Sequence, residues 1–182
     1  MVAGAWSSIA SVIRDARALR RQALTQPGDH LLHSPRRSRR EARILAIAER
    51  LAGFGPTTRP AGEIVTRERG ALADALAGPS PGSALLVAEH ERLGVAGILL
   101  LDTRHDYFTD EPHGHVAILA VAREAEGQGL GGALLEAAEA WARAQGYRRL
   151  TLTVFTDNQR AKAVYARRGW RPELEVYHKT LA

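Results

Sequence analysis

Apolar residues in the middle of the chain follow strand-like spacing before a glycine-rich stretch and helical spacing after it. Two apolar runs, at 83–90 and 93–102, lie only two polar residues apart, which predicts a β-hairpin. A polar loop at 103–114 separates them from HVAILAV at 115–121, which predicts a third strand. Beyond the glycines, residues 130–145 carry apolar side chains three and four positions apart, which predicts a helix.

Weaker patterns on either side complete the predicted fold. Residues 148–156 alternate as a strand, and shorter stretches predict a first strand at 30–38, helices at 39–53, 66–78 and 158–168, and a last strand at 175–181. One helix thus joins two neighbouring strands, a connection that is typical of parallel strands. The order predicts an α/β (α+β) fold: a mixed, mostly antiparallel central sheet flanked by helices, with one parallel strand–loop–helix–strand crossover.

Residues 1–28 form a separate N-terminal extension in this prediction. Between residues 5 and 25, apolar side chains recur on one helical stripe, Trp6 among them, and the pattern ends before Pro27. We therefore expect a helix here and the main domain at 29–182. Two roles are open for the extension. Its apolar stripe either packs on the main domain or forms the contact of a homodimer.

Composition narrows the class of protein. A chain of 182 residues with 45% hydrophobic content suits one globular domain. It has no cysteine, which excludes disulfides and thiolate catalysis, and its seven histidines lack a metal-binding spacing, so we expect no metal. No apolar run approaches the roughly 18 residues of a membrane span, and the first residues lack the pattern of a signal peptide. We expect a cytoplasmic protein without a membrane partner.

Positive charge is concentrated in residues 1–60, which hold eleven arginines and four acidic residues in a chain of net charge +5. Such a cluster can attract nucleic acid by counterion release. Arginine outnumbers lysine 23 to 2, however, and arginines on solvated helix faces need no ligand. We expect no nucleic-acid partner; the alternative, a nucleic-acid arm in residues 1–50, predicts salt-dependent DNA binding that is lost when these residues are deleted.

The glycine-rich stretch, EAEGQGLGGALL at 124–135, is the strongest local signal. Gly127, Gly129 and Gly132 satisfy G-x-G-x-x-G, the fingerprint of dinucleotide-binding folds. Glycines between a strand and a helix expose backbone N–H groups, and with the helix N-terminus behind them these form a cradle for a diphosphate. The alternative interpretation is a tight turn with close helix packing.

A Rossmann fold is one candidate for this fingerprint. In its favour, Asp157 follows the next strand about where a ribose-binding acid is expected. Against it, a charged tetrapeptide at 123–126 separates the strand from the first glycine, and only about 50 residues follow the loop, too few for the usual parallel strands. We set this interpretation aside.

Two motifs together point elsewhere. The first is G-x-G-x-G followed by two leucines, and the second is N-x-x-A-x-x-x-Y-x-x-x-G-[aromatic], which is present as Asn158, Ala161, Tyr165, Gly169 and Trp170. Their types and their spacing, one helix and one strand apart, resemble the GCN5-related N-acetyltransferase (GNAT) superfamily. The clear resemblance covers about a third of the chain, and residues 1–28 lie outside it.

This resemblance implies acetyl-CoA as the cosubstrate. Its diphosphate would be held by the backbone of Gly127, Gln128, Gly129, Leu130, Gly131 and Gly132. Its pantetheine arm would pair with the backbone of the strand residues Leu119, Ala120 and Val121 and with the side chain of Asn158, and Tyr165 would reach the sulfur.

Each implied role has a structural alternative. Leu119 and Val121 are core residues in either case. Asn158 is also a good helix N-cap, and Tyr165 at helical spacing from its neighbours also suits packing.

Transfer of an acyl group from a thioester to an amine moves two protons. The ammonium, with a pKa of about 10.4, must lose one, and the departing thiolate, with a pKa of about 8.5 by analogy with cysteine, is helped by gaining one. The phenol of Tyr165, with an ordinary pKa of about 10, stays protonated at neutral pH and is the candidate general acid. A strand N–H between Leu119 and Val121 is the candidate donor to the oxyanion.

Two features depart from the family pattern. Many members carry a carboxylate on the central strand, where this chain has AILA at 117–120, so the general base is not identified; His115 or Glu111 acting through water are the substitutes. Glu124 and Glu126 replace the usual basic or amide residues before the glycines, and carboxylates there repel a diphosphate unless they point away.

The sequence thus predicts an acetyl-CoA-dependent N-acetyltransferase that acts on a primary amine of an unidentified small molecule or protein. The alternative is a non-catalytic acyl-CoA-binding regulatory module, because the strand carboxylate is missing. The loop at 103–114 leads into the central strand and is expected on the acceptor side, where Asp110 and Glu111 suit a cationic amine.

Overall fold

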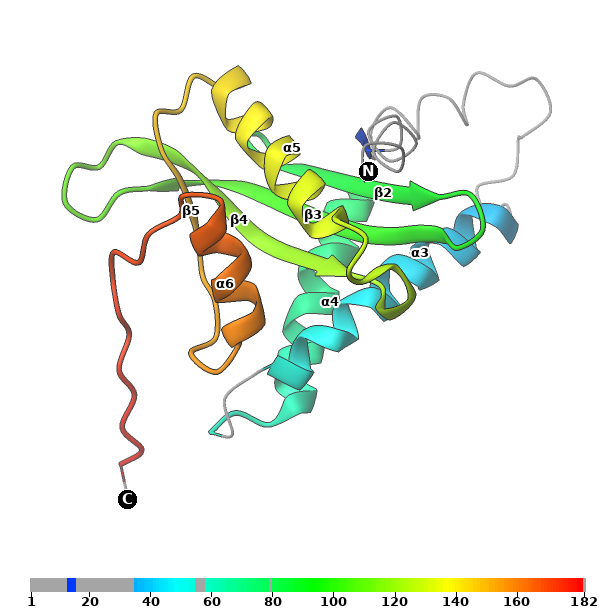
Figure 1. Cartoon of the computed structure of the whole chain (residues 1–182), viewed down its shortest axis with the longest axis horizontal. Coiled ribbons are helices and arrows are strands. Elements are labelled where there is room, and N and C mark those ends of the chain that lie inside the picture. Colours follow the sequence, from blue (N-terminus) through cyan, green and yellow to red (C-terminus); the bar gives the residue numbers. More distant parts are fainter. Residues whose placement is uncertain (1–12, 16–34, 55–57, 79, 182) are drawn as a thin grey trace.

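The centre of the molecule is a five-stranded mixed sheet (Figure 1). The computed structural model describes residues 13–15, 35–54, 58–78 and 80–181. In spatial order the strands are β1 (Ile13–Asp15), β2 (Ala84–His90), β3 (Gly94–His105), β4 (Pro112–Val121) and β5 (Leu150–Leu152). The first four pair antiparallel, and β5 runs parallel to β4. The predicted fold class is confirmed.

Helices cover both faces of the sheet (Figure 1). They are α3 (Pro35–Ala48), the 3-10 helix η1 (Glu49–Phe54), α4 (Ala61–Ala77), the 3-10 helix η2 (Arg123–Ala125), α5 (Leu130–Ala144) and α6 (Gln159–Arg167). The helix α5 lies on one face, and α3 and α4 lie on the other. Leucine, isoleucine and valine side chains from the strands fill both layers, together with Ile44 of α3 and Leu134 of α5.

Two strand glycines let α5 pack closely on the sheet. A Cβ added at Gly97 would lie 3.0 Å from Leu134 Cδ1, and one at Gly114 would lie 2.9 Å from Leu150 Cδ1 and 3.1 Å from Trp141 Cζ3. Because these two positions carry no side chain, α5 can approach the sheet closely. Protein interiors leave no spare volume for an added methyl group.

Several predicted boundaries are wrong at their edges. The strands β3 and β4 extend into the predicted loop, so the connection covers only residues 106–111. The helix predicted at 66–78 begins at Ala61, and the strand predicted at 148–156 is limited to β5. The predicted first strand is wrong where it can be compared, because residues from Pro35 onward are helical, whereas 30–34 lie outside the described residues.

The predicted N-terminal helix is wrong at residues 13–15. This segment is β1, which pairs antiparallel with β2 in the register Ile13↔Ala88. Hydrogen bonding to the edge of a formed sheet overrides a weak local helical pattern. The remainder of the predicted extension, residues 1–12 and 16–28, lies outside the described residues, and the division at residue 28 stays a prediction.

The predicted C-terminal strand is also wrong. Residues 171–181 have no regular secondary structure and run away from the sheet (Figure 1). The large side chains of Val176 and Tyr177 are 93% and 87% exposed. Alternation of side chains in a sequence favours a strand only where a neighbouring strand supplies hydrogen-bond partners.

Candidate functional site

The strands β4 and β5 separate partway along their length. They pair only from Gly114↔Leu150 to Val116↔Leu152. The next residue, Ala117, is a bulge, because Leu101 and Leu100 of β3 pair with Val116 and Ile118 on either side of it. A bulge bends its strand. From residue 117 to 121, β4 thus pairs with β3 alone in the described sheet, and its edge toward β5 is open.

Of the three predicted strand residues, Leu119 and Val121 turn their backbone groups to this open edge, whereas those of Ala120 turn to β3. Ala122 N–H donates to Ala96 O, on the β3 side, at 2.8 Å. Backbone groups alternate between the two sides of a strand, so those of Leu119 and Val121 face the opening. The Val121 carbonyl accepts a hydrogen bond from Arg50. The side chains of Leu119 and Val121 are half-buried and only that of Ala120 is fully buried, so the prediction that both are core residues holds in part.

The glycine loop follows β4 and η2 and ends at the start of α5. Gly127 and Gly129 have φ values of +74° and +80°, a left-handed conformation that glycine adopts without strain. Gly129 is the N-cap residue of α5, no side chain caps this helix, and its first turn carries no acidic residue. The first N–H groups of a helix lack intrahelical acceptors and carry partial positive charge. The predicted residues from Gly127 to Gly132 therefore present donors suited to an anion.

Arginines bind the two glutamates that depart from the family pattern. Glu126 accepts from Arg50 and Arg160, and these two hydrogen bonds lower the pKa of its carboxyl. Glu124 pairs with Arg43 at 3.2 Å, and its pKa is lowered by its own backbone N–H and by this arginine. Both carboxylates are thus ionised and neutralised. No local sequence pattern indicates these partners, because they lie 34 to 81 residues away along the chain.

Asn158 is the N-cap of α6. Its Oδ1 accepts the Ala161 N–H at 3.1 Å, so the capping alternative describes what this side chain does. The cap uses only the carbonyl oxygen, and an asparagine amide also has two donor hydrogens. Capping and binding of a ligand are therefore compatible.

Tyr165 lies near the C-terminal end of α6. Its carbonyl accepts the N–H groups of Arg168 and Trp170, and its ring lies 6.2 Å from that of Trp170, centroid to centroid. Burial raises the pKa of the Tyr165 phenol above its ordinary value. The hydroxyl is therefore protonated at neutral pH, as a general acid must be, and the catalytic role of Tyr165 stays a prediction.

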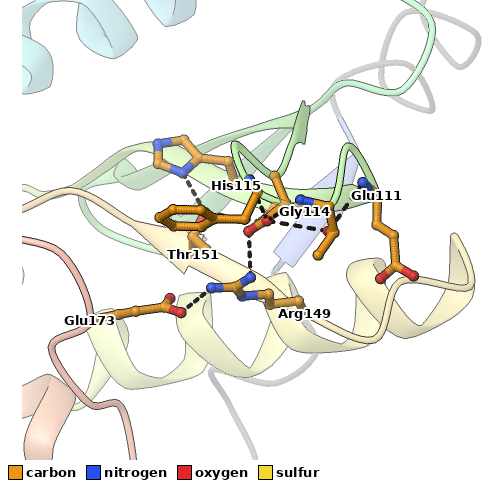
Figure 2. Close-up of polar contacts among 9 residues, drawn as sticks. Glu111, Gly114, His115, Arg149, Thr151 and Glu173 are labelled. Carbon is orange, nitrogen blue, oxygen red and sulfur yellow. Dashed lines mark hydrogen bonds and ion pairs between the residues drawn. The ribbon is translucent and has the colours of Figure 1, made fainter.

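The two candidate substitutes for the general base differ in environment. His115 is buried on β4, and its Nδ1 lies 2.8 Å from Thr151 Oγ1 on β5 (Figure 2). Burial lowers the pKa of His115 to about 4, so the ring is neutral at pH 7. Glu111 is exposed in the β3–β4 loop, and its side chain points away from His115 (Figure 2). This loop enters β4 at the end opposite the glycine loop.

Asp106 gives that loop a fixed shape. Its carboxylate accepts the backbone N–H groups of Phe108 and Thr109, each at 3.0 Å, and these bonds lower its pKa. Arg149 pairs with both Asp106 and Glu173, which joins the loop to the beginning of the C-terminal segment. Asp110 and Glu111, the residues predicted to face a cationic acceptor, both lie in this ordered loop.

The features above define a class of protein: a mixed sheet whose open strand edge leads to an anion-suited helix N-terminus. In the described part of the chain, no helix combines the length and apolarity that crossing a bilayer requires, and no three histidine, aspartate or glutamate side chains gather as a metal site.

Comparison with known proteins gives this class a family. The sequence model of the Acetyltransferase (GNAT) family matches residues 45–170, more than half of the chain. The chain belongs to the GNAT acetyltransferase family.

Related sequences agree with this assignment. Mycothiol acetyltransferase of Jonesia denitrificans is 45% identical over 65 residues, which cover 34% of this chain and 21% of that protein. N-alpha-acetyltransferase 80 of Mus musculus is 41% identical over 75 residues, covering 41% and 20%. The chain therefore aligns with about a fifth of the length of these relatives.

Solved structures share the fold at low sequence identity. A putative acetyl transferase from Pyrococcus furiosus superimposes with a TM-score of 0.65 at 20% identity, covering 93% of this chain and 98% of that one. The aminoglycoside N-acetyltransferase AAC(6')-Iy in complex with CoA gives a TM-score of 0.60 at 15% identity, with 80% and 91% covered.

Proposed function

We propose that the chain is an N-acetyltransferase that moves an acetyl group from acetyl-CoA to a primary amine of a small molecule or protein. The observation that carries this proposal is the open edge of β4, which leads through η2 to the glycine loop at the N-terminus of α5. A Cβ at Gly127 would meet nothing within 4 Å, so there is space for a ligand against the loop backbone. Several similar proteins are also named for acetyl transfer.

The residues present fit such a cosubstrate. The backbone from Gly127 to Gly132 would hold the diphosphate, and the N–H of Val121 and the C=O of Leu119 would pair with the pantetheine arm as an added strand does. The Asn158 amide would donate to the same arm. Acetyl-CoA supplies the thioester whose carbonyl carbon the amine attacks.

Two groups of the chain would then act on the reacting atoms. The backbone N–H of Leu119 also faces the opening and would donate to the oxyanion. The Tyr165 phenol would give its proton to the departing thiolate, a role that its raised pKa supports at neutral pH.

Release of free CoA from acetyl-CoA with a panel of amines tests the reaction. We expect Tyr165→Phe to lower kcat by about 10²- to 10³-fold while the Kd for CoA stays within about twofold, because only the proton donor is lost. Tyr177→Phe is the matched control, since this tyrosine is exposed and bonds only locally to Glu175. Unchanged turnover in Tyr165→Phe would refute the assigned role.

Because β4 carries no carboxylate, the amine needs another way to lose its proton. A neutral imidazole with a pKa of about 4 is a weak acceptor for the proton of an ammonium with a pKa of about 10.4. We expect the amine to lose its proton before it attacks, so that kcat/KM rises with pH until the amine itself is deprotonated. A plateau above pH 6 to 7 would instead indicate a side-chain base.

The same missing carboxylate favours a second candidate, a non-catalytic acyl-CoA-binding regulatory module. Binding of CoA without turnover of any amine, in the wild type as in Tyr165→Phe, would support this function over catalysis.

A further inference from the structure

Arg168 reaches from the end of α6 to the first turn of α5. Its Nη1 donates to Glu136 Oε1 at 2.9 Å. Its guanidinium also lies over Gly132, because a Cβ added at that glycine would fall 2.1 Å from Nη2 and 2.7 Å from Cζ. The side chain of residue 168 therefore occupies the space that any larger residue at position 132 would fill.

This position is unusual for a cation. The N-terminus of α5 is already positive, since its first N–H groups lack acceptors and no acidic residue stands in its first turn. The nearby Glu126 is bound by Arg50 and Arg160, and Glu136, the seventh residue of α5, is the carboxylate that pairs with Arg168. The guanidinium and the helix N-terminus are both positive and repel each other, whereas an anion beside them would be attracted to both.

We propose that Arg168 is a specificity-determining residue for the diphosphate of CoA: it pairs with Glu136 in the free protein and turns to the diphosphate when the cosubstrate binds. This inference rests on the proposed function. Guanidinium groups bind phosphate oxygens through paired, charge-assisted hydrogen bonds. Gly132 makes the turn feasible, because no side chain separates Arg168 from the start of α5.

Calorimetric titration with CoA, 3′-dephospho-CoA and pantetheine tests the assignment. We expect Arg168→Gln to weaken CoA and 3′-dephospho-CoA alike, by about tenfold or more, and to leave pantetheine unchanged, because only the first two carry the diphosphate. Arg168→Lys should recover part of the loss. The neighbouring Arg167 is exposed, and Arg167→Gln is the control expected to stay within about twofold of the wild type.

A second variant tests the exchange of partners. Glu136→Gln removes the competing carboxylate but leaves Arg168 in place, so CoA should bind about two- to fivefold more tightly, as expected for the loss of an ion pair whose carboxylate is exposed. Weaker binding in this variant would overturn the exchange.

The remaining outcomes separate the two proposals. If the wild type binds no CoA, the proposed function fails. If the wild type binds CoA and Arg168→Gln binds it equally well, only the inference about Arg168 fails. A loss for CoA that is absent for 3′-dephospho-CoA would place Arg168 at the 3′-phosphate and overturn its assignment to the diphosphate. Equal urea midpoints for the variants confirm that each compared protein is folded.

Discussion

Among single residues, His115 makes the folded state sensitive to acid. Burial lowers its pKa from 6.5 to about 4, so between these values the unfolded chain binds a proton that the folded protein does not. Stability is therefore full above pH 6.5 and falls as the pH drops toward 4, by up to about 3 kcal/mol. Urea unfolding at pH 7.5, 6 and 5 measures this change. His115→Gln removes the titrating ring and should flatten the slope; an identical slope would show that other groups cause it.

The observed cap and the proposed ligand contact of Asn158 involve different atoms of its amide, so variants can test them separately. Asn158→Ala should lower the free energy of unfolding by about 1 kcal/mol, since the Ala161 N–H loses its acceptor. Asn158→Ser keeps a capping oxygen but has no amide donor. Near wild-type stability together with weaker CoA binding in the serine variant would show that the side chain both caps and binds, whereas unchanged binding would leave the cap as its only role.

At the scale of elements, the packing of α5 on the sheet depends on the absence of a side chain at Gly114. Gly114→Ala should cost about 1 to 3 kcal/mol, because its Cβ would press on Leu150 and Trp141. Gly70→Ala, inside α4 with open space around its Cβ, should have the opposite sign and stabilise by about 0.5 to 1 kcal/mol through helix propensity. Chemical denaturation of both variants checks this contrast, and destabilisation by both would contradict it.

Long segments with periodic apolar residues could be predicted from the sequence. Short segments whose conformation depends on pairing with another strand could not. The hairpin, β4, α5 and α6 each carry enough residues for their apolar spacing to identify them. The three residues of β1 acquire their conformation from β2, and residues 175–181 alternate as a strand does but lie where no strand pairs with them. In both segments the deciding interactions are tertiary, and local spacing does not contain them.

At the scale of the whole molecule, binding of acetyl-CoA should stabilise the fold. At a concentration 100 times the Kd, a ligand that binds only the folded state adds about 2.7 kcal/mol, which raises Tm by roughly 5 to 10 °C for a domain of this size. A thermal melt with and without the ligand measures this shift. S-acetyl-N-acetylcysteamine, which carries the thioester without the diphosphate, should cause no comparable shift; no effect of acetyl-CoA at saturation would count against the proposed function.

The candidate site was predictable as far as its parts are local in sequence. The left-handed glycines, the uncapped start of α5 and the Asn158 cap follow from neighbouring residues. The bulge at Ala117 appears only in the register of β3 against β4, and the arginines that neutralise Glu124 and Glu126 come from distant segments. Spatial neighbours of this kind leave no pattern in one sequence.

The two arginines bound to Glu126 also bear on the order in which the chain assembles. One lies 76 residues before it and the other 34 residues after it. Contacts between such distant residues form only after the intervening chain has closed into loops, which makes them late steps in folding. A nascent chain that has not yet completed α6 would therefore contain the glycines, Glu126 and Arg50 but lack Arg160, and the second ion pair of Glu126 would be among its final native contacts.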